Sequence, residues 1–264
     1  MQHGFAARNG LLAALLARAN YTGIERVLEL PYGGFFTCFG RQSQSPPPNP
    51  HFSTLGTEWE TNNILTKPYP LMATLHAPVD CIRLLQAKHK AQLAITENIT
   101  SIKIEQAEAA FAHGGWRVND RSIEVTGAQM SAAYAVALQL TDGEVVPTSF
   151  KADKVNRPAL FDLIWKTDCM HQPAFDGEGM KLKTRVTICF EGGGEVVGMV
   201  EEPRGVEPKM SEGEVLGKWG DGVLGLVGER RCKVIEEGVM GLEKLKGLGE
   251  LLGELKGEVG SVLD

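Results

Sequence analysis

The first residues of the chain carry three side chains that could bind an anion. His3, Arg8 and Asn9 lie within the string QHGFAARNG at residues 2–10. Small and apolar residues around them predict a tightly packed helix, at whose beginning donors and a cation could face a carboxylate. Residue types alone favour the plainer interpretation, in which Arg8 pairs with a buried acid and His3 lies on the surface.

A second group of candidates surrounds a proline-rich turn. Lys67 precedes Pro68-Tyr69-Pro70, and His76 follows at the beginning of a predicted helix. A lysine beside such a turn is held more rigidly than one on a helix face, so its ammonium could hold a substrate carboxylate or stabilise charge in a transition state. The alternative is an ordinary surface lysine. At a helix N-terminus the imidazole of His76 is expected to be neutral, and it could shuttle a proton or simply cap the helix.

Two hydroxyls form a third group, on an alanine-rich segment. Ser131 and Tyr134 lie one helical turn apart and could present their hydroxyls to a cleft. A tyrosine at such a position is otherwise a good core residue with a hydrated tip. The five scattered cysteines lack zinc spacing, and Gly192-Gly193-Gly194 lacks the lysine and helix of a phosphate loop. We therefore expect chemistry that needs no metal and no cofactor.

Bulk composition restricts the class of partner. The 264 residues carry a net charge of −6 without a basic stripe, which argues against nucleic-acid binding but allows cations in a cleft to attract an anionic substrate. An uninterrupted apolar run of about 18 residues is absent, so a membrane partner is not expected. The N-terminus lacks a signal-peptide pattern, and scattered cysteines are typical of reduced thiols. These features predict a cytoplasmic protein.

The order of the predicted elements suggests how these groups are positioned. Polar, proline-rich residues 41–50 mark a boundary, and the predicted elements become helical again after Pro203. These two changes predict domains at 1–50, 51–205 and 206–264. The middle region is α+β and both flanks are helical. We therefore expect an α+β fold in which an all-helical domain, built from both chain ends, carries an inserted smaller α+β domain. Predicted helices cover 5–19, 22–29, 77–91, 126–140, 157–165, a stretch from 211, and 229–245; predicted strands cover 59–66, 101–106 and a hairpin over 181–201.

Longer strings resemble a known family. QHGFAARNGLLAALLA, Tyr32-Gly33-Gly34-Phe35, Lys67-Pro68-Tyr69-Pro70 with His76, and Gly127 to Ser131 with Tyr134 closely resemble the MmgE/PrpD family. Among its members, the sequences of these strings are most similar to those of the fungal cis-aconitate decarboxylases. The resemblance implies a cleft between the two domains, in which Lys67, His76 and Tyr134 are catalytic. His3, Arg8, Asn9 and Ser131 are then expected to bind a small tricarboxylate substrate. Met72 stands where relatives can carry histidine or cysteine, and it cannot transfer protons.

The implied activity is that of a cofactor-independent carbon-carbon lyase converting cis-aconitate to itaconate. A hydro-lyase acting on 2-methylcitrate is the alternative, because both reactions need the same clamp for carboxylates. Family members are longer and often homodimeric, and a full-length relative could be mitochondrial. Most of the family's first helical domain is expected before residue 1. Since the apolar helix over 5–19 needs a cover, a third possibility is a non-catalytic fragment that binds a partner chain or a complementing N-terminal segment.

Overall fold

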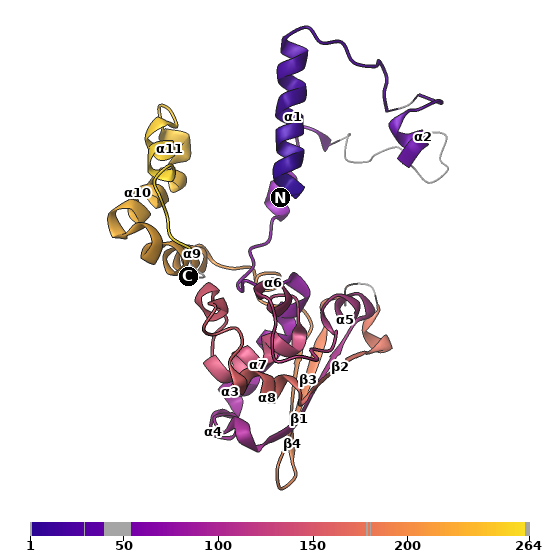
Figure 1. Ribbon diagram of the computed structural model, residues 1–264, viewed down its shortest axis with the longest axis vertical. Coiled ribbons are helices and arrows are strands. Elements are labelled where there is room, and N and C mark those ends of the chain that lie inside the picture. The colour runs from indigo at the N-terminus through magenta and orange to yellow at the C-terminus, as the bar shows by residue number, and fades with distance from the viewer. Residues whose placement is uncertain (1, 29, 40–53, 178, 180, 262–264) are drawn as a thin grey trace. The chain divides into compact units, whose positions relative to one another are not determined.

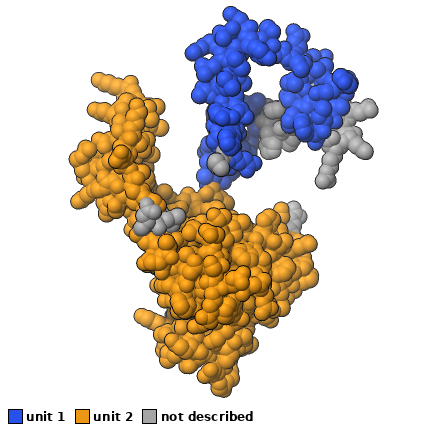
Figure 2. All heavy atoms as spheres, viewed as in Figure 1, with its two compact units in different colours: residues 1–64 blue, residues 65–264 orange. Residues whose placement is uncertain are grey.

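The computed structural model describes residues 2–28, 30–39, 54–177, 179 and 181–261. It divides into two compact units, residues 1–64 and 65–264, which Figure 2 distinguishes by colour. Helices occur in both units, and the second also contains a four-stranded sheet. The α+β class is therefore confirmed. Among the described residues, no helix combines the length and apolar character that crossing a membrane requires.

The first unit contains one long helix and two short elements. Helix α1 spans Gln2–Arg18, which confirms the helix predicted over 5–19, and every residue of it is exposed. The helix predicted over 22–29 is wrong: residues 25–28 form a turn, with Arg26 at a φ of 54°, a left-handed conformation that interrupts a helix. The strand predicted over 59–66 is also wrong, because Glu60–Asn63 forms the 3₁₀ helix η2. Phe35–Phe39 forms α2, and the predicted boundary at 41–50 lies outside the described residues.

The second unit begins and ends with helices, and its four strands lie between them in the sequence. Its elements, in chain order, are η3 (Ala73–Leu75), α3 (His76–Lys88), α4 (Lys90–Leu93), η4 (Thr96–Asn98), β1 (Ile99–Gln106), α5 (Glu108–Gly114), α6 (Val125–Ala128), α7 (Ala132–Asp142), η5 (Pro147–Phe150), α8 (Pro158–Ile164), β2 (Thr167–His171), η6 (Pro173–Phe175), β3 (Thr184–Phe190), β4 (Glu195–Val200), α9 (Glu212–Val227), α10 (Glu229–Met240), η7 (Leu242–Lys244) and α11 (Gly249–Leu255).

The sheet has the order β2-β1-β3-β4, with β1 and β2 parallel and the other pairs antiparallel (Figure 1). Helices α3, α7 and α8 contact it. Its buried face includes Ile102, Ile104, Val186 and Ile188. The alternation along β1 and the hairpin of β3 and β4 were both predicted correctly, since side chains on successive strand residues face opposite sides of the sheet.

Two helices differ in detail from their predictions. The helix predicted over 126–140 is broken into α6 and α7, because Ser131 adopts extended backbone and its Oγ accepts a hydrogen bond from the Tyr134 amide at 3.3 Å. Helix α6 begins at Val125, one residue before the predicted start at residue 126. Helix α3 confirms the prediction for 77–91, although it ends at Lys88 and its Leu84 is 46% exposed.

Candidate active site

Lys67 and His76 meet at the carbonyl oxygen of Leu71. The Lys67 Nζ donates a hydrogen bond to this oxygen at 3.1 Å, and the His76 Nε2 lies 3.4 Å from it. Pro68 and Pro70 restrict the backbone between these groups and leave fewer amides to satisfy. The turn over residues 67–71 thus brings together two of the side chains that the sequence identified.

Burial sets the charge of His76. Its ring is 3% exposed and packs edge-on against the Tyr69 ring, with centroids 5.3 Å apart. The pKa of His76 is lowered to about 4, chiefly by burial and in smaller part by Lys67 and Lys218, while the Leu71 carbonyl and Asp80 act in the opposite direction. The imidazole is therefore neutral at pH 7. Since its Nε2 faces a carbonyl, the Nε2 carries the proton, and His76 acts as a hydrogen-bond donor.

A buried carboxylate that the sequence analysis missed supports this turn. Asp80 is 8% exposed; its Oδ1 accepts a hydrogen bond from the Tyr69 hydroxyl at 2.5 Å, and its Oδ2 accepts one from the Arg204 amide at 2.7 Å. Burial, followed by Asp80, raises the pKa of Tyr69 above its ordinary value. The spacing of His76 and Asp80, one helical turn apart on α3, was a signal for this carboxylate. No local pattern indicated the contribution of Arg204.

A hollow of about 390 Å³ lies against the same turn. Both signs of charge line it: three cations and three carboxylates share the wall with Tyr69, Pro68 and Pro70. The charged members are Arg83, Arg204, Lys218, Glu144, Glu214 and Asp221. Arg204 Nη1 is 3.6 Å from a Glu214 carboxylate oxygen, and the Arg204 Nε is buried without a hydrogen-bond partner among the described atoms. The wall of the hollow therefore combines cations that suit a carboxylate with carboxylates that offset their charge.

Ser131 and Tyr134 lie in the core instead of at a cleft. The Tyr134 hydroxyl donates to the Val155 carbonyl at 2.9 Å, and its ring stacks on Phe150 with centroids 6.1 Å apart. Burial raises the pKa of Tyr134 to about 12. Ser131 is fully buried and caps α7. The interpretation that both present hydroxyls to a cleft is therefore wrong in this structure, because each hydroxyl has a local partner and faces the core.

The remaining candidates belong to the first unit. His3, Arg8 and Asn9 are exposed on α1, where an Arg8 nitrogen lies 3.4 Å from the Asn9 side-chain oxygen. The Arg8 guanidinium also lies over the Phe5 ring, 5.2 Å from its centroid. Within the described part of this unit, Arg8 thus contacts an amide and an aromatic ring instead of the buried acid considered above.

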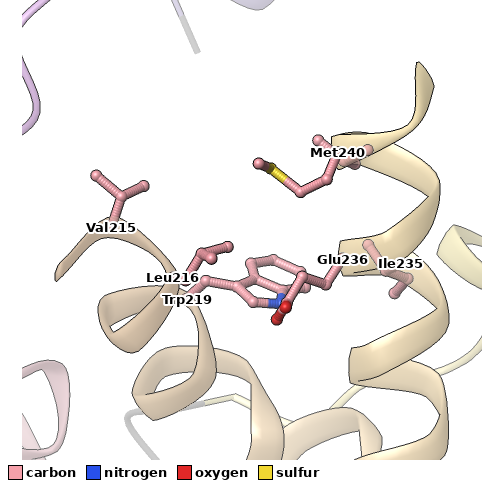
Figure 3. A pocket seen from close by; sticks show the side chains of 7 residues that line it. Val215, Leu216, Trp219, Ile235, Glu236 and Met240 are labelled. Carbon is pink, nitrogen blue, oxygen red and sulfur yellow. The ribbon is translucent and has the colours of Figure 1, made fainter. Parts of the chain in front are cut away.

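One other hollow offers less for an anion. A pocket of about 230 Å³ between α9 and α10 is lined by Val215, Leu216, Trp219, Ile235, Glu236, Val239 and Met240 (Figure 3). Its only charged lining residue is a carboxylate, so it does not suit a tricarboxylate. Across the described residues, no cluster of three or more His, Cys, Asp or Glu side chains has the geometry to hold a metal ion.

Comparison with known proteins relates this geometry to a family. The family profile of the MmgE/PrpD C-terminal domain matches residues 69–244. The chain is 35% identical over 264 residues to a cis-aconitate decarboxylase-like protein of Aspergillus oryzae, covering 98% of this chain and 55% of the relative. It is 35% identical over 260 residues to the cis-aconitate decarboxylase of Aspergillus terreus, covering 96% and 53%. The human cis-aconitate decarboxylase is 24% identical over 174 residues, covering 64% and 34%.

The matches cover nearly all of this chain but a smaller share of each fungal relative. The chain spans about half the length of the fungal proteins that it matches. The agreement nevertheless extends over nearly all of this chain, and the family profile covers more than half of it. The chain therefore belongs to the MmgE/PrpD family.

Proposed function

We propose that this chain supplies the C-terminal part of a carbon-carbon lyase of the cis-aconitate decarboxylase type. The observation that carries the proposal is the 35% identity, over 96% of the chain or more, to fungal proteins of that name. The proposal includes the architecture that the resemblance implies. In it, helices from both chain ends form one helical domain, and the smaller α+β domain is inserted into it.

The turn over residues 67–71 provides chemistry that suits such a substrate. An exposed lysine beside a buried neutral imidazole presents a positive charge next to an N–H donor. The ammonium suits a carboxylate because it attracts its charge, and the buried His76 N–H helps to hold the Leu71 carbonyl that positions the ammonium. Their shared contact with the Leu71 carbonyl fixes their positions before substrate arrives, which favours electrostatic stabilisation of developing charge.

The proposed reaction converts the cis-aconitate trianion and one proton into the itaconate dianion and carbon dioxide. The bond between the methylene carbon and its carboxylate breaks, and its electron pair forms a new double bond to the central carbon. The former double bond takes the proton at its other carbon. Lys67 would hold a retained carboxylate while this charge moves. Because His76 has a pKa of about 4, we assign it a hydrogen-bonding role and not that of the general acid.

Incubation of the purified chain with cis-aconitate, followed by NMR detection of itaconate, tests this proposal. Lys67→Met should abolish turnover and weaken cis-aconitate binding at least about tenfold, as expected for the loss of a charge-assisted contact. Lys233→Met is the matched control. Lys233 forms an exposed ion pair with Glu237 on α10, at 3.8 Å, so its loss should change neither quantity.

The outcomes separate the alternatives. Release of itaconate supports decarboxylation. If the chain instead dehydrates 2-methylcitrate and releases no itaconate, its activity is that of a hydro-lyase. Binding of cis-aconitate without any turnover would favour a non-catalytic chain that acts with a partner. If the chain neither binds nor converts these acids, the proposal is refuted.

A further inference from the structure

Helix α9 contacts the Lys67 turn through Lys218. The Lys218 Nζ donates a hydrogen bond to the Lys67 backbone carbonyl at 2.6 Å, across 151 residues of sequence. The Lys67 side chain meanwhile donates to the Leu71 carbonyl. Lys67 is thus held at two points, its peptide by Lys218 and its ammonium by Leu71. A short hydrogen bond from a charged donor is among the stronger contacts available to a backbone carbonyl.

Further contacts fix the beginning of α9 near the same turn. The Glu214 Oε2 accepts hydrogen bonds at 2.9 Å from both the amide and the hydroxyl of Ser211, which closes the capping box. The other Glu214 oxygen lies 3.6 Å from Arg204, whose amide donates to Asp80. Gly205 lies so close to the Thr66 carbonyl oxygen that a Cβ at this position would overlap it. The segment before α9 and the turn before α3 therefore form one connected network.

We propose that Lys218 is a positioning residue for the Lys67 turn, holding the Lys67 carbonyl so that the ammonium and the His76 imidazole keep their shared contact with Leu71. The effect of Lys218 on catalysis rests on the proposed function, whereas its hydrogen bond to the Lys67 carbonyl does not depend on that proposal. Lys218 also lines the hollow beside the turn, with Arg83 and Arg204. Its charge therefore acts on the same space as the proposed substrate site.

The charge of Lys218 gives the role a signature beyond packing. Charged and polar groups face His76 from three elements: Lys67, Tyr69 and the Leu71 carbonyl in the turn, Asp80 on α3, and Lys218 on α9. Lys218 and Lys67 both lower the pKa of His76, whereas Asp80 raises it. Removing the Lys218 charge should therefore raise the His76 pKa above about 4. A contact made by an uncharged side chain would not produce this shift.

The test compares Lys218→Met, Lys218→Arg and the control Lys233→Met in the full chain without substrate. Hydrogen exchange in residues 65–76 should become about tenfold faster in Lys218→Met, because a charge-assisted hydrogen bond is lost. NMR titration of the His76 ring should show a raised pKa in the same variant. Lys218→Arg keeps the charge, so its His76 pKa should stay near the wild-type value. The control should change neither exchange nor pKa.

Cis-aconitate binding then connects the contact to the proposed function. We expect affinity to fall about tenfold in Lys218→Met and to recover in part in Lys218→Arg. The inference is overturned if the hydrogen-exchange rate of residues 65–76 and the His76 pKa both stay at wild-type values in Lys218→Met. A pKa that rises equally in Lys218→Met and Lys218→Arg would also overturn it, because the charge would then be irrelevant. If the exchange and pKa changes occur and no variant binds cis-aconitate, the contact holds and the proposed function fails.

Discussion

The buried His76 should make the stability of this chain depend on pH in a defined window. Its pKa is about 4 in the folded chain, against an ordinary value of 6.5. Between these two values the unfolded chain binds a proton that the folded chain does not, so stability is lost as pH falls below 6.5. The difference of about 2.5 units corresponds to about 3 kcal/mol in total, of which about 2 kcal/mol should be lost by pH 5.

Urea unfolding followed by circular dichroism, at several pH values between 7.5 and 5, measures this loss. His76→Gln cannot take up the proton and should lack this part of the pH dependence, whatever its stability at pH 7.5. His113→Gln is the matched control, because that ring is exposed on α5. Glu105, whose pKa is lowered to about 2 by its hydrogen bonds to Arg185, loses its contribution mainly below pH 4.5 and does not interfere.

Two results would refute this reasoning. The first is an equal loss of stability between pH 7.5 and 5 in the wild type and in His76→Gln. The second is an NMR titration in which the His76 ring takes up its proton near pH 6.5, which would mean that the imidazole is hydrated and not buried.

Two further substitutions test the contacts that support the fold. Gly205→Ala should cost at least about 2 kcal/mol more than Gly192→Ala, because both have positive φ but only Gly205 also lies against the Thr66 carbonyl oxygen and the Pro68 side chain. Chemical unfolding of the two variants measures the difference. Arg185→Met should cost about 2 kcal/mol, since its guanidinium binds both oxygens of Glu105 at 2.6 Å and that carboxylate is 4% exposed. Lys183→Met, which loses an ion pair to an exposed partner, should cost less than about 1 kcal/mol in the same assay.

These expectations can fail independently. Equal costs for the two glycine variants would mean that the turn moves freely away from Gly205. A cost for Arg185→Met no greater than that of Lys183→Met would mean that the Glu105 carboxylate is hydrated after the change, which infrared spectroscopy of the carboxylate could verify.

Local patterns in the sequence determined much of the α+β unit. Alternation predicted β1 and the hairpin of β3 and β4, and the helical stretch predicted from residue 211 corresponds to the beginning of α9. Helix periodicity placed α3 and α8 within a few residues. These elements were predictable because hydrogen bonds between near neighbours and the direction of each side chain set them. The order of short strings also sufficed to identify the family.

Long-range contacts decided what the sequence could not. The direction of Tyr134 depends on the Val155 carbonyl and on Phe150, so its hydroxyl entered the core although its residue type also suited a cleft. The Lys67 turn is completed by Lys218, 151 residues away, and that pairing has no signal in either local segment. Periodicity reports which face of an element is apolar, but only packing selects the partner of each polar atom. For this reason the sequence named Lys67 and His76, and only the tertiary structure showed that they share one carbonyl.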